Sequence, residues 1–371
     1  MSGNKLRVGI VGCGAIGHNH VRGYLNSGRY EIVGLCDPRP EGMIAFDEAF
    51  SGTEGYSPSH YTKSGEMFKE TNPDVVSVAV WDGLHAPIVE LAASFGVRAI
   101  LCEKPMSDSI GSAAEMIENC REKGIKLAIG HQRRFLPSYN LARSMILEGK
   151  IGEVRLITTF ARDGLPNYSS HLSDTFRYLL GDPECEWVMG NVERKTDQWA
   201  RAIPIEDRAI AMFGFDNGCQ ASILSGLTDY HGFGGRVYGS EGMVEFTVTD
   251  VKLMNTESRG WTLHRPNGAY VKYGTGDFEM LEAGWAQAAE FALWIEGEVD
   301  NYRGDGINGY KALEMVHAVY ESARTYSRVT IPMENTENPL RMMIESGQLP
   351  VTKEGKYDIR ARNWSAPTTP T

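Results

Sequence analysis

The sequence predicts an α/β protein in which an N-terminal doubly wound parallel sheet precedes a C-terminal α+β domain built on a large, mainly antiparallel open sheet. Two observations predict this fold class. Short apolar runs alternate with helical stretches up to about residue 133, whereas strand-like runs separated by turn signals dominate afterwards. We therefore expect domains at residues 1–133 and 134–333, followed by a C-terminal extension at 334–371.

The first strand–helix–strand unit carries a glycine-rich turn. In the stretch LRVGIVGCGAIGHNHVRGYLNSGRYEIVGLCD, an apolar strand runs into Gly12, Gly14 and Gly17 and then into a helix. Gly12 permits a sharp turn, Gly14 lets backbone amides approach a pyrophosphate, and Gly17 lets the helix pack closely on the strand. The amides of Ala15 and Ile16 then begin a helix N-terminus, which favours negative charge. An ordinary turn is the alternative, but the context predicts a dinucleotide-binding Rossmann unit.

The acidic residue that closes this unit bears on the choice of cofactor. Asp37 follows the second strand, about 20 residues after Gly17, where a carboxylate can accept hydrogen bonds from the adenosine-ribose hydroxyls. A 2′-phosphate would meet that carboxylate with like charge. Arg39 instead favours NADP, because an arginine near the ribose can accommodate the 2′-phosphate. The alternative is that Arg39 is a solvated loop residue. We predict NAD, with NADP as the open alternative.

Composition and charge exclude several classes of protein. The 371 residues include 37 Lys plus Arg and 48 Asp plus Glu, for a formal net charge of -11. With no long basic run, we expect neither a nucleic-acid nor an anionic-membrane partner. An N-terminus that enters a strand at once, and the lack of a long apolar run, predict a cytoplasmic protein. Six cysteines without CxxC spacing predict reduced, buried thiols, with no disulfide and no metal site.

Strands and helices alternate through the rest of the first domain. Strands are expected at 74–80, 98–102 and 126–129, helices at 41–50, 64–70, 85–95 and 109–123, and a Gly/Ser/Pro-rich connection at 51–59. In such sheets, ligands bind beyond the carboxyl ends of the strands. The loops at those ends carry further residues expected to bind the cofactor, namely Trp81, His85, Glu103, Lys104 and Gln132.

The second domain has a different pattern. After a helix at 137–148, strands are expected at 154–161, 185–191, 209–215, 219–224, 235–238, 243–247 and 270–273. Helices are expected at 171–180 and 284–297. A further helix at about 310–327 is expected to pack back on the first domain.

Three stretches together resemble one family. The glycine-rich loop, the tripeptide Glu103-Lys104-Pro105 after a strand, and His171 with Asp174 at the start of a helix are similar to the Gfo/Idh/MocA oxidoreductases. These include inositol and sugar dehydrogenases, and the resemblance covers about residues 5–330. It implies hydride transfer between a nicotinamide and a ring hydroxyl carbon of a sugar, sugar derivative or inositol. It also implies a homodimer or homotetramer, with the C-terminal sheet covered by another subunit.

The resemblance implies catalytic roles for Lys104 and His171. Alcohol oxidation requires a base for the hydroxyl proton and a cation for the developing alkoxide charge, which these side chains can supply. We expect partial burial and a cationic nicotinamide to lower the pKa of Lys104. Asp174 lies three residues after His171 on the same helical face, so both can contact one substrate.

The sequence departs from the family before the histidine. Many members have an aspartate four residues before it, where this chain has Asn167. An amide can orient an imidazole or bind a hydroxyl but carries no charge. Either Asp163 or Asp174 takes over the electrostatic role, or His171 works with a less basic ring. We predict Asp163, Asn167 and Asp174 as substrate-binding residues.

Other pocket residues are assigned by position. Trp81 stands where relatives commonly have a Pro-Asn pair, and it either walls the nicotinamide or substrate pocket or is a buried aromatic. Arg133, in GHQRRF, is expected to fix a substrate hydroxyl or carboxylate, with solvated arginines as the alternative. Two early histidines are expected to be phosphate-side or capping groups rather than metal ligands, namely His18 and His20.

Two other functions remain open. One is an NAD-requiring glycosidase that uses a transient oxidation and therefore accumulates no NADH. The other is a non-enzymatic dinucleotide-binding regulator of the same fold, which the presence of both Lys104 and His171 disfavours.

Overall fold

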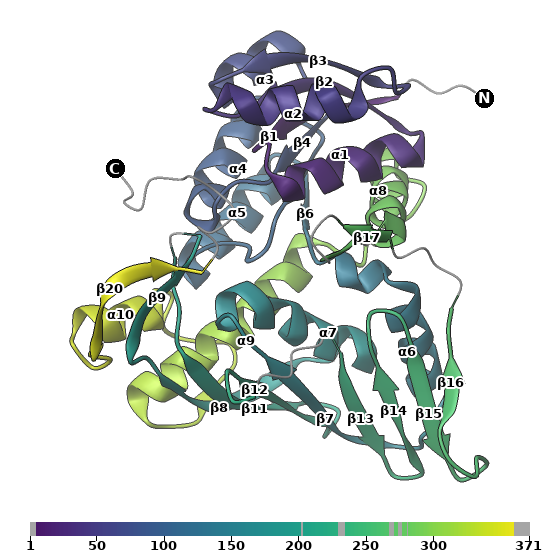
Figure 1. The fold of residues 1–371 in the computed structure, drawn as a ribbon, viewed down its shortest axis with the longest axis vertical. Helices are drawn as coiled ribbons and strands as arrows, with labels where there is room; N and C mark the ends of the chain where they lie inside the picture. The colour runs from purple at the N-terminus through teal and green to yellow at the C-terminus, as the bar shows by residue number, and fades with distance from the viewer. Residues whose placement is uncertain are drawn as a thin grey trace. The chain divides into compact units, whose positions relative to one another are not determined.

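The chain forms two compact units in the computed structural model (Figure 1). The described residues are 5–201, 203–228, 234–266, 271–273, 277–279 and 281–359. Unit 1 comprises Met1–Ser107, Ser112–Phe135 and Gly268–Gly309, and unit 2 comprises Asp108–Gly111, Leu136–Asn267 and Tyr310–Thr371. Unit 1 therefore includes a late segment that the expected boundary at residue 133 does not anticipate.

Unit 1 is built on a six-stranded parallel sheet in the order β3-β2-β1-β4-β5-β6. The strands are β1 (Leu6–Val11), β2 (Tyr30–Cys36), β3 (Tyr56–Tyr61), β4 (Val75–Val78), β5 (Ala99–Cys102) and β6 (Lys126–Ile129). β4 and β5 are buried along their whole length, as expected for central strands of a sheet covered on both faces. The predicted doubly wound sheet is confirmed, with its strands reversing order at β1.

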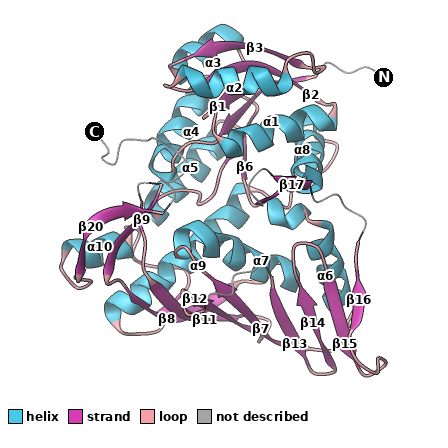
Figure 2. Ribbon diagram, in the orientation of Figure 1, coloured by secondary structure: helices cyan, strands magenta, loops and turns pink. Residues whose placement is uncertain are grey.

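In the described part of the chain, five helices connect these strands, and one later helix belongs to the same unit (Figure 2). They are α1 (Ala15–Ser27), α2 (Pro40–Phe50), α3 (Ser64–Thr71), α4 (His85–Ser94), α5 (Ile110–Glu122) and α8 (Leu281–Glu296), with short 3₁₀ turns η1 (Asp82–Leu84) and η2 (Gln132–Phe135). α8 packs on α1, where a Cβ on Gly23 would lie 2.8 Å from the carbonyl oxygen of Gly284. A late helix thus completes the core of the first unit.

The prediction of an irregular connection at 51–59 is wrong in its second half. β3 begins at Tyr56 and pairs in parallel with β2. Its sequence, YSPSHY, has mostly polar side chains and a proline, because β3 is the edge strand of the sheet. Edge strands tolerate proline and lack the apolar pattern of central strands, so the segment resembles a loop in sequence.

Unit 2 contains a nine-stranded sheet in the order β16-β15-β14-β13-β7-β12-β11-β8-β19. The bounds are β7 (Val154–Ala161), β8 (Cys185–Glu193), β11 (Arg208–Phe215), β12 (Gln220–Ser225), β13 (Gly235–Gly239), β14 (Gly242–Phe246), β15 (Val251–Asn255), β16 (Thr262–His264) and β19 (Val329–Thr330). All neighbouring strands are antiparallel except β7 and β12. The predicted large, mainly antiparallel sheet is confirmed.

Further helices and short strands complete the structure. They are α6 (Pro137–Leu147), a π-helical turn η3 (Leu165–Ser169), α7 (Ser170–Leu180), α9 (Gly306–Thr325), α10 (Pro339–Glu345) and three short strands β9 (Thr196–Ala200), β10 (Ile203–Pro204) and β20 (Lys353–Asp358). β20, from the C-terminal extension, pairs in parallel with β9. A separate two-stranded antiparallel sheet is formed by β17 (Val271–Tyr273) and β18 (Asp277–Glu279).

Four further expectations concern a late strand, a late helix, the cysteines and membrane-spanning segments. The predicted strand at 270–273 is present as β17, and its residue 270 lies outside the described residues. The helix expected at about 310–327 is confirmed as α9, and its packing on the first domain stays a prediction. All six cysteines are buried free thiols. Among the described helices, none is both long and apolar enough to cross a membrane.

Candidate active site

The glycine-rich loop after β1 has the geometry of a phosphate-binding turn. Gly12 adopts a φ of 97°, and a Cβ there would lie 2.3 Å from the carbonyl oxygen of Ala79. A Cβ on Gly17 would lie 2.2 Å from the carbonyl oxygen of Gly12, so only glycine allows α1 to approach the turn. α1 begins after Gly14 with no side-chain cap and no acidic residue in its first turn. Its first amides can therefore donate to a pyrophosphate, which fits a dinucleotide cofactor.

Asp37 lies beside this loop at the end of β2. Its Oδ2 accepts a hydrogen bond from the backbone N–H of Cys13 at 2.9 Å, and its Oδ1 accepts one from the N–H of Arg39 at 2.9 Å. The Arg39 Nε lies 3.6 Å from the same carboxylate. A buried carboxylate is therefore held at the position that contacts the adenosine ribose in dinucleotide-binding units.

Lys104 lies in the turn that follows β5. It is only 7% exposed, and its peptide bond to Pro105 is cis. The ring of His85 connects this turn to the loop after β4, with Nδ1 2.9 Å from the carbonyl oxygen of Pro105 and Nε2 3.2 Å from that of Val80. His85 therefore supports the turn that carries Lys104, and its expected contact with the cofactor stays a prediction.

Glu103 is held in place by a chain of buried polar groups. Its Oε1 lies 3.1 Å from His20 Nε2, and His20 Nδ1 lies 2.7 Å from Ser77 Oγ. Its Oε2 accepts the backbone N–H of Lys104 at 3.2 Å. Burial alone would raise the pKa of Glu103, but the hydrogen bond from His20 and the charges of His20 and Lys104 outweigh it and lower the pKa. Gly130 leaves room for this carboxylate, since a Cβ there would lie 2.3 Å from Oε1.

The early histidines thus do not act as helix caps. His20 pairs with Glu103, while His18 packs against the rings of Phe46 and Phe50. Burial, with a smaller effect of Arg22, lowers the pKa of His18.

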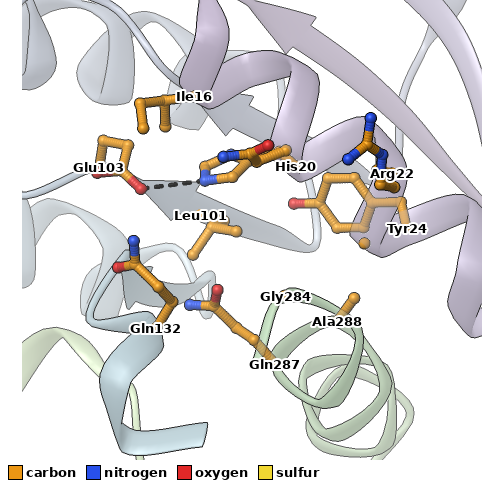
Figure 3. Close-up of a pocket in the computed structure, with 12 residues that line it drawn as sticks. Ile16, His20, Arg22, Tyr24, Leu101, Glu103, Gln132, Gly284, Gln287 and Ala288 are labelled. Atoms are coloured by element: carbon orange, nitrogen blue, oxygen red, sulfur yellow. Dashed lines mark hydrogen bonds and ion pairs between the residues drawn. The ribbon is translucent and has the colours of Figure 1, made fainter. Parts of the chain in front are cut away.

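A small cavity of about 50 Å³ lies between α1, the end of β5, η2 and α8 (Figure 3). Figure 3 shows the His20–Glu103 pair on its wall. The cavity brings together three residues predicted to bind the cofactor, namely Ile16, Glu103 and Gln132.

For two predicted pocket residues, the exposure of the side chain rules out one of the two interpretations given above. Arg133, in η2, is fully buried together with Arg134, so the solvated alternative is wrong. Trp81 is 40% exposed before η1, so the buried-aromatic alternative is also wrong. Contact of either residue with a ligand stays a prediction.

In unit 2, the predicted residues gather on the π-helical turn η3 and on α7. Asp163 and Gly164 precede the turn with φ values of 60° and 79°. Asn167 lies within the turn, and His171 and Asp174 lie on α7, every residue of which is buried. Asp163 pairs with Arg162, with 3.6 Å between Oδ2 and Nε.

A buried carboxylate that sequence reasoning missed anchors this turn. Glu206 Oε1 accepts the backbone N–H of Leu165, the first residue of η3, at 2.7 Å, and Oε2 accepts the hydroxyl of Tyr320 on α9. Burial raises the pKa of Glu206 to about 7, although both hydrogen bonds act in the opposite direction. No sequence signal marks Glu206, because its partners are far away along the chain.

Arg201 is a second residue that sequence reasoning missed. It follows β9, and its Nη1 lies 3.5 Å from Oδ1 of Asn167, which is 34 positions earlier in the chain. Nothing in the local sequence indicates this contact.

Known proteins match this chain in both its N-terminal and its C-terminal part. A family described as "Oxidoreductase family, NAD-binding Rossmann fold" matches residues 6–131, and its "C-terminal alpha/beta domain" matches residues 164–331. D-apiose dehydrogenase from Paraburkholderia graminis is 23% identical over 368 residues, covering 92% of this chain and 94% of its own. D-glucoside 3-dehydrogenase from Escherichia coli is 24% identical over 364 residues, covering 89% and 99%.

A solved structure has the same fold. Levoglucosan dehydrogenase in complex with NADH and levoglucosan superposes with a TM-score of 0.74 at 20% identity, covering 89% of this chain and 100% of the other. At this identity the likeness shows the fold alone. The two family matches span most of the chain, and together with the glycine-rich loop they lead to one conclusion: the chain belongs to the Gfo/Idh/MocA family of NAD-binding oxidoreductases.

Proposed function

We propose that this oxidoreductase transfers a hydride between NAD and a ring hydroxyl carbon of a sugar, sugar derivative or inositol. The observation that carries the proposal is the buried Lys104 at the carboxyl end of β5, in the unit that carries the phosphate-binding turn. Relatives along most of the chain are named as dehydrogenases of apiose and of glucosides, which supports a carbohydrate substrate.

The reaction balances as an alcohol plus NAD⁺ giving a carbonyl, NADH and a proton. When bound, the nicotinamide supplies the acceptor for the hydride. Residues of this chain manage the proton: a neutral Lys104 amine can accept it from the hydroxyl, and His171 can pass it on or stabilise the developing alkoxide. Asp174 and Asn167 offer hydrogen-bond acceptors for neighbouring hydroxyls.

Supporting residues hold these groups in place before the substrate binds. Glu103 fixes the main chain of Lys104, and His85 holds the following proline turn. Because Lys104 is buried, little water can compete for its amine. Preorganised donors and acceptors of this kind stabilise charge in a transition state without further reorganisation.

The exposed face of the large sheet supports a proposal for the assembly. Met189 on β8 and Ile210 on β11 lie on one face and are 58% and 49% exposed. We infer that a second subunit covers this face, giving a homodimer or homotetramer. Light scattering of the purified protein should show this state, and Ile210→Lys should shift it toward monomer. A cytoplasmic location and the lack of nucleic-acid or membrane partners stay predictions.

An assay of NADH formation tests the activity. Purified protein and NAD are incubated with inositols, aldoses, anhydrosugars, sugar acids and glycosides, and NADH absorbance is followed together with product analysis. We expect net formation of NADH with at least one of these alcohols. Release of an aglycone without net NADH would indicate the glycosidase, and NAD binding without turnover of any compound would indicate the regulator.

A further inference from the structure

Arg201 occupies a tightly built turn in unit 2. Ala200 of β9, the residue before it, pairs with Ile203 of β10. Arg201 adopts a φ of 51°, in the left-handed region that residues with side chains rarely occupy. Its backbone N–H donates to Oδ1 of Asp358, at the end of β20, at 3.2 Å. The C-terminal extension therefore fixes the backbone of one arginine in an unfavourable conformation.

The side chain of this arginine reaches the candidate active site. Its Nη1 lies 3.5 Å from Oδ1 of Asn167, which is the long limit for a hydrogen bond. Among the described residues, this is the one hydrogen bond that the guanidinium makes, and no carboxylate there forms an ion pair with it. A guanidinium carries five N–H donors, so most of its binding capacity is available.

The charge of Arg201 is not neutralised at this position. Asn167 offers an amide oxygen, which accepts a hydrogen bond but carries no charge. The acidic groups nearby along these segments have other partners: Asp163 pairs with Arg162, Asp358 accepts the backbone N–H of Arg201, and Glu206 accepts from Leu165 and Tyr320. A positive charge therefore faces Asn167 without a negative partner in the described chain.

His171 lies close to this pair along the chain. Asn167 belongs to the π-helical turn η3, which leads directly into α7, and His171 is the second residue of α7. A carboxylate bound at Arg201 would therefore lie at the turn that leads into the helix of His171. A planar guanidinium binds a carboxylate with two parallel hydrogen bonds. A single such group suits one negative charge better than the double charge of a phosphate monoester.

We propose that Arg201 and Asn167 form a carboxylate-binding subsite and that the substrate is a sugar acid or a polyol that carries a carboxylate. This proposal rests on the proposed function, because it identifies the substrate class of the same site. Arg201 then determines specificity by binding a group remote from the carbon that is oxidised.

The test compares matched substrates. Each neutral aldose or polyol is paired with the corresponding aldonate or uronate, and kcat and KM are measured for the wild type and for Arg201→Gln, Arg201→Lys and Asn167→Asp. The wild type should prefer the acids. Arg201→Gln should raise KM for the acids by about 10- to 100-fold, the range for a lost charged hydrogen bond, and leave kcat and the neutral substrates nearly unchanged.

Two further variants sharpen the interpretation. Asn167→Asp should weaken binding of acids in the same way, because the new carboxylate would pair with Arg201, whereas Arg201→Lys should retain part of the preference. The control is Arg155→Gln on β7, which removes an exposed arginine paired with Glu153 and should change nothing.

The outcomes separate this proposal from the proposed function. Turnover of neutral sugars with no preference for acids, or an equal loss for both classes in Arg201→Gln, would overturn the subsite and leave the dehydrogenase intact. A preference for sugar phosphates over carboxylates would overturn the substrate class. If no alcohol yields NADH, the proposed function fails. The subsite is then tested by calorimetry in the presence of NADH: the acids should bind more tightly to the wild type than to Arg201→Gln, and equal binding would overturn the subsite.

Discussion

The two units hold their candidate residues in different ways. In unit 1, close backbone contacts define the candidate residues: Gly12 and Gly17 leave no room for a Cβ, and Glu103 hydrogen-bonds the backbone N–H of its neighbour, Lys104. In unit 2, distant side chains hold the site, since Glu206 anchors η3 and Asp358 anchors the turn of Arg201. Backbone contacts therefore shape the two turns of unit 1, whereas the candidate residues of unit 2 depend on side chains far away along the chain.

The largest effect should come from unit 1. Lys104→Ala should lower kcat by about 10²- to 10⁴-fold, since the variant loses a group that acts on the hydroxyl proton. NAD affinity should stay within a few-fold, because the glycine-rich turn holds the phosphates. Steady-state kinetics and NAD titration measure the two quantities, with Lys123→Ala, at an exposed position just after α5, as control. Near-normal kcat would reduce Lys104 to a structural role.

The next effect concerns the anchor of unit 2. The pKa of Glu206 is about 7 in the folded chain against an ordinary value of 4.5. Because folding raises this pKa, the protonated side chain of Glu206 contributes its full stabilisation below pH 4.5, and this stabilisation is lost as the pH rises through 7. The difference between the two pKa values corresponds to about 3 kcal/mol. Glu206→Gln cannot ionise, so the free energy of unfolding of the wild type should fall relative to this variant across that range.

Chemical unfolding at several pH values measures this difference. Glu257→Gln, at an exposed position, is the control and should follow the wild type. A wild type and Glu206→Gln with parallel pH profiles would show that the carboxylate keeps an ordinary pKa.

A smaller effect is expected at the ribose contact. Asp37→Ala should weaken NAD binding by about 10- to 100-fold, the range for charged hydrogen bonds, and should weaken NADP binding less. Asp37→Asn, which keeps the shape but loses the charge, should give an intermediate preference. Dissociation constants for both cofactors measure the change. An unchanged ratio would place Asp37 away from the ribose.

The smallest effect should come from His20. His20→Gln keeps a hydrogen-bond donor near Glu103 but removes the charge that lowers the pKa of that carboxyl. We expect kcat to fall by roughly tenfold, about 1.4 kcal/mol, with NAD affinity unchanged. The pH profile of kcat should also shift, whereas a purely structural role for His20 would lower stability without moving the profile.

The sequence predicts the core of both folds because their central strands have strong patterns. β4 and β5 are continuous apolar runs, and β7 alternates between its two faces. β3, β10 and β20 lack such patterns, since they are short, polar or at an edge, and they form because a neighbouring strand is already in place. Tertiary pairing, which local sequence does not encode, determines these strands.

The same distinction applies to the site. Gly12, Asp37, Lys104 and His171 belong to compact motifs, in which a few adjacent residues determine the geometry. Arg201 and Glu206 stand in no motif, and their roles depend on contacts with residues at least 34 positions away. His20 lies in the glycine-rich unit, yet its partner Glu103 lies 83 positions later in the chain, after β5. Only the folded chain shows such pairs.

The most direct test of the central claim follows the hydrogen that is transferred. A substrate deuterated at the carbinol carbon is incubated with NAD and the wild type, and the nicotinamide product is analysed by mass spectrometry and NMR. The account predicts one deuterium at C4 of the nicotinamide for each carbonyl formed, and a rate of deuterium transfer that is about 10²- to 10⁴-fold lower in Lys104→Ala. A carbonyl product without deuterium in NADH, or an equal rate of transfer by Lys104→Ala, would contradict it.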